Sequence, residues 1–189
     1  MILYLAGCPV SLGHEHTLCT IAGLRYRLLS FADVNIAREG FSFWTSTRAP
    51  APFFLDSGAF AASTQGTQID LDAYCAFIEA HEAARPYASL DVIGEWRASA
   101  KNHDVMRARG LDPVPTFHMG SPAHELRRLL KEVDYLALGG VVGASRKLMQ
   151  PWLDGCFSII RAHWPKRIHI TAYQHYITCL WEGRGVSWS

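Results

Sequence analysis

The chain has 189 residues, of which 49% are hydrophobic and 19% charged, and its formal net charge is +1. This composition fits one globular domain over residues 1–189 with a sizeable core, and it excludes a chain that is mainly disordered. The small net charge excludes a strong overall field for polyanions, so any nucleic-acid contact would depend on a local arginine patch.

The cysteines and the amino terminus indicate a cytoplasmic protein. The five cysteines are odd in number and widely spaced, without a C-x-x-C pair, so we expect reduced thiols. The first apolar run is too short for a signal peptide or a membrane span. We therefore expect no membrane partner.

The first half of the chain contains a strand that ends in a carboxylate. Strands are predicted over residues 2–6 and 27–31, with a helix over 14–24 between them, and a third strand covers the apolar residues 53–55. Asp56 follows at its carboxyl end. A carboxylate without partners in a dry core costs several kcal/mol, so Asp56 is either bonded by local amides, as in an Asx turn, or used chemically.

The same pattern returns in the middle of the chain. Asp70 is predicted to cap a helix whose inner face carries Leu71, Tyr74, Cys75 and Ile78. A buried strand over 87–94 then carries Asp91, and a basic helix over 99–109 stops at Gly110, which suits the position after a helix end.

The second half continues this alternation. A strand over 113–117 leads to His118, and Ser121-Pro122 opens a helix with an inner stripe of Leu126, Leu129, Leu130 and Val133. A strand over 135–140 ends in Gly139-Gly140. A helix over 146–164, a strand over 167–171, a helix over 173–181 and a last strand over 185–188 complete the series.

About eight buried strands that alternate with helices predict an α/β fold with a parallel sheet. Polar or glycine-rich ends after nearly every strand favour a compact TIM-like (β/α)8 barrel that lacks the last helix. An open doubly wound sheet is the alternative.

The strand-end motifs, in this order, resemble the tRNA-guanine transglycosylases, also called queuine tRNA-ribosyltransferases, in their short phage-type form. Asp56-Ser57-Gly58-Ala59-Phe60 is similar to that family's D-S-G-G-F motif, with alanine in place of one glycine. Asp91 matches its second aspartate, and His118 stands where the family has Gln-Gly. Gly139-Gly140 resembles its G-G-L segment. The resemblance covers the chain from about residue 50 to about residue 171.

The resemblance implies a glycosyltransferase that exchanges guanine for a 7-deazaguanine base in tRNA or DNA through a covalent glycosyl enzyme, without a cofactor. Asp56 would handle protons, Asp91 would accept from the NH groups of the base, and the glycine pair would offer amides to its carbonyl. Asp56 and Asp91 are thus the predicted catalytic residues. The predicted base-binding residues are Ser57, Gly58, Phe60, His118, Gly139, Gly140 and His169. No metal ligand is assigned, and a second copy or a partner subunit is a candidate partner.

The last predicted strand departs from the family. Ser187 stands where the family has its nucleophilic aspartate, and a serine without an identifiable base is a poor glycosyl acceptor. Three alternatives stay open: an enzyme that uses Asp56 or another carboxylate, a noncatalytic base-binding or partner barrel, and a shortened chain.

Two further features have a functional and an ordinary interpretation. His14-Glu15-His16, with His118 and His169, could begin the metal site of a divalent-metal hydrolase, although exposed histidines at a helix start are expected more often. Six basic residues on two helices could follow a phosphate backbone, although charged outer helix faces are the ordinary explanation and are expected more often: Arg97, Lys101, Arg107, Arg109, Arg127 and Arg128.

Overall fold

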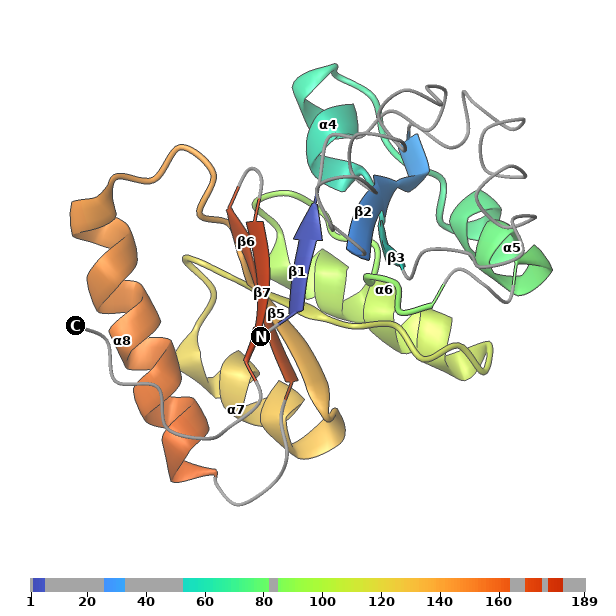
Figure 1. Ribbon diagram of the computed structural model, residues 1–189. Helices are drawn as coiled ribbons and strands as arrows, with labels where there is room; N and C mark the ends of the chain where they lie inside the picture. The colour runs from blue at the N-terminus through green and yellow to red at the C-terminus, as the bar shows by residue number, and fades with distance from the viewer. Residues whose placement is uncertain are drawn as a thin grey trace. The chain divides into compact units, whose positions relative to one another are not determined.

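The structure is a computed structural model that describes residues 2–5, 26–32, 53–81, 85–163, 169–174 and 177–181 (Figure 1). The chain divides into two compact units, Leu3–Val114 and Pro115–Ser189 with Met1–Ile2. Each unit is described by itself, and the single domain over residues 1–189 stays a prediction.

The unit of residues 3–114 contains parallel strands. Strand β1 (Ile2–Leu5) pairs with β2 (Tyr26–Ser30), and β2 pairs with β3 (Phe53–Asp56), all in parallel. Beyond β3, Leu55 forms a parallel bridge with Tyr87, and Ala88 forms one with Val114. The end of β3 therefore lies beside the segment that leads to Asp91.

Three helices accompany these strands: α4 (Ala59–Thr64), α5 (Leu71–Ala80) and α6 (Trp96–Ala108). The predicted cap of α5 is confirmed, because Asp70 accepts a hydrogen bond from the backbone N of Ala73 at 2.7 Å. Helix α6 ends before Gly110, whose φ of +83° is the left-handed conformation expected after a helix. One apolar core joins strands and helices: Leu29, Phe31, Phe53, Leu55, Tyr74, Cys75, Ile78, Tyr87, Leu90 and Met106.

The other unit combines parallel and antiparallel pairing. Strand β4 (Thr116–His118) pairs in parallel with β5 (Tyr135–Gly139), and β5 pairs in parallel with β6 (His169–Gln174). Strand β7 (Ile177–Trp181) is antiparallel to β6. Helices α7 (Ala123–Glu132) and α8 (Arg146–Ala162) pack on β4 and β5 through a second core. The predicted stripe of α7 belongs to that core: Leu126, Leu129, Leu130 and Val133.

The predicted (β/α)8 barrel is wrong. Residues 173–181, expected to form a helix, contain instead the end of β6 and strand β7, and these two strands pair antiparallel. Such a barrel requires parallel strands, each connected through a helix. Residues 87–94 form only the bridges at Tyr87 and Ala88 instead of a full strand, and the short helix α4 was not predicted. Mixed α/β structure is what the described residues support.

Several predictions fall on residues that the structure does not describe. The helix over 14–24, its histidines and the last strand with Ser187 lie outside the described residues. Within the part of the chain that the structure describes, none of the helices has both the length and the apolar character that a membrane span needs.

Candidate functional site

Asp56 ends β3 and begins a tight turn. Its Oδ2 accepts a hydrogen bond from the backbone N of Gly58 at 3.1 Å, and the buried Ser57 accepts one from the N of Ala59 through its Oγ at 3.4 Å. Gly58 has a φ of +78°, a conformation that side chains other than glycine's rarely adopt. The Asx turn that the sequence allowed is therefore present, and it fixes the half-buried Asp56 carboxylate at the carboxyl end of the strand.

Asp91 lies at the corresponding end of the neighbouring segment. The backbone N of Leu55 donates to the O of Pro86 at 2.9 Å, and the N of Ala88 donates to the O of Leu55 at 2.8 Å. The two stretches therefore run in parallel, and their carboxyl ends point the same way. Asp91 follows Ala88 by three residues and is half-buried like Asp56.

Tyr74 connects the two aspartates electrostatically. Its side chain, on α5, is fully buried, and its hydroxyl donates to the O of Ala88 at 2.8 Å. Burial raises the pKa of Tyr74 well above its usual value of 10, and the negative charges of Asp56 and Asp91 raise that pKa further. Burial is the main cause of this raised pKa, and the two aspartates add to it in the same direction.

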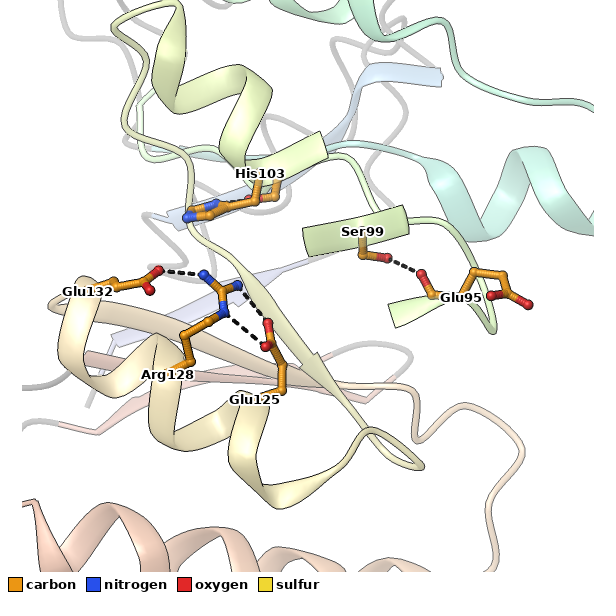
Figure 2. A network of polar contacts seen from close by, with 7 residues as sticks. Glu95, Ser99, His103, Glu125, Arg128 and Glu132 are labelled. Atoms are coloured by element: carbon orange, nitrogen blue, oxygen red, sulfur yellow. Dashed lines mark hydrogen bonds and ion pairs between the residues drawn. The ribbon is translucent and has the colours of Figure 1, made fainter. Parts of the chain in front are cut away.

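Side chains of α6 bond the main chain on both sides of Asp91. The Ser99 Oγ accepts from the backbone N of Val92 at 2.9 Å, and the Asn102 Nδ2 donates to the O of Leu90 at 3.0 Å. In Figure 2, Ser99 also directs its hydroxyl toward the backbone O of Glu95, 3.2 Å away.

A buried histidine and serine complete this set. The His103 Nδ1 and the Ser89 Oγ are 2.8 Å apart, and the two side chains are 1% and 2% exposed. Figure 2 shows His103 projecting from α6. The sequence analysis missed the role of α6, although the polar residues at 99, 102 and 103 are spaced to share one helix face.

Two large apolar side chains near these carboxylates are open to solvent. Phe60, in the first turn of α4, is 42% exposed, and Ile93, two residues after Asp91, is 41% exposed. Phe60 was predicted as a base-binding residue, and its side chain is partly exposed to solvent. Ile93 was not predicted.

In the other unit, His118 and the glycine pair come together. His118 is opposite Gly139 in the parallel pairing of β4 and β5, and a Cβ at Gly139 would lie 3.5 Å from the His118 Cδ2. The backbone N of Met119 donates to the O of Gly139 at 2.9 Å. Gly140 has a φ of +73°, and a Cβ there would lie 2.9 Å from the N of Met119. A Cβ at Gly139 would also lie 2.6 Å from the Thr116 Cγ2, so both glycines pack too closely against β4 and the residue after it to carry a side chain, whereas the His118 ring is at an ordinary contact distance.

His169 is not part of that group. It is the first residue of β6 and pairs with Tyr135, whereas Gly139 lies at the other end of β5. Four residues of extended strand separate these positions by about 13 Å. The structure thus places His169 at the amino end of the strands, away from His118 and the glycine pair.

One basic residue of α7 and one at the end of α6 form ion pairs. Arg128 donates to both carboxylate oxygens of the buried Glu125, at 2.7 and 2.9 Å, and to Glu132 at 2.6 Å (Figure 2). These bonds, above all the one to Glu125, raise the pKa of Arg128 above its usual range. Arg109 forms an ion pair with Asp72. Two of the six candidate phosphate contacts are thus paired with carboxylates, which favours the ordinary interpretation.

The described residues contain no group of three or more histidine, cysteine, aspartate or glutamate side chains close enough to hold a metal ion. His14 and His16 lie outside that part of the chain, so the metal-hydrolase alternative stays a prediction.

Comparison with known proteins gives no relative. No family model, no curated protein and no solved structure matches this chain. The resemblance to the transglycosylases therefore depends on the motifs themselves, and the geometry around Asp56 and Asp91 has to carry any functional proposal.

Proposed function

We propose that the unit of residues 3–114 binds a guanine-type base through Asp56 and Asp91, and that the chain exchanges this base in a nucleic acid. The observation that carries the proposal is the pair of half-buried carboxylates that follow two adjacent parallel segments at their carboxyl ends. Strand ends of this kind are where α/β proteins bind their ligands.

Guanine presents two neighbouring hydrogen-bond donors that one carboxylate can accept. Its Watson–Crick edge presents N1–H and the 2-amino group side by side, and an ionised carboxylate accepts two such donors at once. A half-buried carboxylate is desolvated enough to make these bonds strong and exposed enough to be reached. Phe60, predicted to bind the base, is 42% exposed, and stacking of an aromatic side chain on a base is worth about 1–3 kcal/mol.

Base exchange would proceed by two displacements at the ribose. One carboxylate attacks C1′ as the bond from C1′ to the base nitrogen breaks, and the departing base takes up a proton from the other carboxyl group. The incoming 7-deazaguanine then returns a proton to that group and displaces the protein. Asp91 holds the base edge in this proposal, so the attack on C1′ and the proton transfer fall to Asp56 and a further carboxylate that is not assigned. The polymer, tRNA or DNA, is left open, and a cytoplasmic location is part of the proposal.

One observation favours noncatalytic binding as a second candidate. Asp56 already accepts a hydrogen bond from Gly58, and such a bond stabilises the charged carboxylate and so weakens it as a nucleophile. Noncatalytic binding would leave guanine affinity intact but give no covalent sugar adduct.

Calorimetric titration of the full chain with guanine tests binding, and incorporation of labelled guanine into tRNA or duplex DNA tests exchange. Asp56→Asn and Asp91→Asn should each abolish both. Asp104→Asn, which changes an exposed carboxylate on α6, is the matched control and should behave as the wild type. Wild-type affinity in both site variants would refute the proposal. Binding without exchange and without an adduct would select the noncatalytic candidate.

A further inference from the structure

We propose that Ser99, Asn102 and His103, here named the α6 clamp, position Asp91 for the base. This inference rests on the proposed function and adds residues that the sequence motifs do not contain. The clamp bonds the residues directly before and after Asp91, since Asn102 holds the O of Leu90 and Ser99 holds the N of Val92. The backbone of Asp91 is therefore fixed on both sides.

His103 extends the clamp by one more residue of the same segment. Its Nδ1 bonds the Oγ of Ser89, whose own backbone N donates to the O of Val114 at 2.8 Å. Ser89 is thus held from the helix through its side chain and from the neighbouring segment through its backbone.

Packing alone does not account for these residue types. Ser99 is 7% exposed and His103 is 1% exposed, and polar groups so deeply buried destabilise a core unless they are bonded. An apolar face on α6 would fill the same space without that cost. Directional hydrogen bonds from a polar helix face instead fix the backbone of the adjoining segment. The Asp91 carboxylate is then already in position when a planar ligand binds, so binding does not pay the entropy cost of ordering it.

The experiment compares substitutions in the clamp with a core substitution in the same helix. His103→Leu and Asn102→Leu remove clamp bonds while keeping most of the side-chain volume. His103→Asn keeps a polar atom near the Nδ1 position and should restore the bond to Ser89. Met106→Ala removes a fully buried core side chain outside the clamp, and Lys101→Ala changes an exposed one. Ser99→Ala is a milder clamp variant should the leucine variants fail to fold.

The readouts are the dissociation constant for guanine, the midpoint of urea unfolding, and amide hydrogen exchange at Val92. His103→Leu and Asn102→Leu should weaken guanine binding about tenfold, as outer-shell substitutions do around other sites. His103→Asn should stay near the wild type, and Ser99→Ala should speed exchange at Val92. Met106→Ala should lower the unfolding midpoint without weakening guanine binding in the folded protein.

Wild-type affinity in His103→Leu and Asn102→Leu, together with lost binding in Asp91→Asn, would overturn the clamp and leave the proposed function standing. Equal loss of affinity in Met106→Ala and His103→Leu would also overturn it, since a purely structural role predicts that result. No guanine binding by the wild-type chain, or unchanged binding in Asp91→Asn, would overturn the proposed function and the clamp with it.

Discussion

Replacing Gly58 with alanine tests how tightly the turn after β3 is built. Gly58 has a φ of +78°, and a left-handed conformation costs an alanine about 1–2 kcal/mol. An added Cβ would also lie 2.7 Å from both the Cβ of Ala32 and the Oγ of Ser30, and 2.9 Å from the backbone N of Ala32. Carbon atoms normally stay about 3.5–4.0 Å apart, so the backbone has to move.

Overpacking of this kind costs about 1–3 kcal/mol, which gives about 2–5 kcal/mol in total for Gly58→Ala. Gly66→Ala is the matched control. Gly66 has a φ of +68°, but nothing lies within 4 Å of its added Cβ, so this variant should lose only about 1–2 kcal/mol. Urea unfolding followed by circular dichroism measures both losses on the same unit of the chain.

The Gly58 substitution should also disturb the site, because the backbone N of Gly58 donates to the Asp56 carboxylate. We expect Gly58→Ala to weaken guanine binding in the folded protein and Gly66→Ala to leave it unchanged. Equal destabilisation by the two variants would show that Gly58 does not pack closely against Ser30 and Ala32, and the described turn would then be wrong.

Three smaller predictions follow from single contacts. Burial, with the charges of Asp56 and Asp91, raises the pKa of Tyr74, so the unfolded chain loses the hydroxyl proton at a lower pH than the folded chain does. The free energy of unfolding should therefore fall as the pH rises above 10, and Tyr74→Phe should make this fall less steep by about 1.4 kcal/mol per pH unit. An unchanged slope in the variant would contradict the buried position of Tyr74. Asp70→Ala removes the cap of α5 and should lower the free energy of unfolding by about 1 kcal/mol, measured by urea unfolding, whereas a loss below about 0.3 kcal/mol would argue against the cap. Burial raises the pKa of Cys156 to about 11, so less of this thiol is ionised in the folded chain than in the unfolded one. Iodoacetamide at pH 8 should therefore modify the native thiol at least 100-fold more slowly than the unfolded thiol, as measured by mass spectrometry of the Cys156 peptide. Equal rates would place that thiol at the surface.

Local features of the sequence predicted several of the elements. The cap at Asp70, the helix end before Gly110 and the inner stripe of α7 each depend on a few neighbouring residues, and each is present. The apolar run before Asp56 likewise predicted a buried parallel strand. Such signals are local because helix caps and buried faces are set within one or two turns.

The fold-level error arose where pairing between strands decides the outcome. Residues 173–181 contain apolar and aromatic side chains that fit a helix or a strand, and their antiparallel pairing with β6 selects the strand. The order of strand-end motifs indicated which residues matter but not how the strands close. His169 shows the same limit, because only the register with Tyr135 reveals that it lies at the opposite end of β5 from Gly139.

The two interpretations of Asp56 are compatible, and the choice of substitution separates them. A carboxylate has about four acceptor positions, so accepting from Gly58 does not by itself exclude a role in binding a base. Asparagine keeps an oxygen that can accept from Gly58 but has no charge, whereas alanine loses both. If Asp56 serves only the turn, Asp56→Asn should keep guanine binding and the free energy of unfolding close to the wild type, and Asp56→Ala should lower stability. If the charge is used, Asp56→Asn already loses binding while its stability stays within about 1 kcal/mol of the wild type.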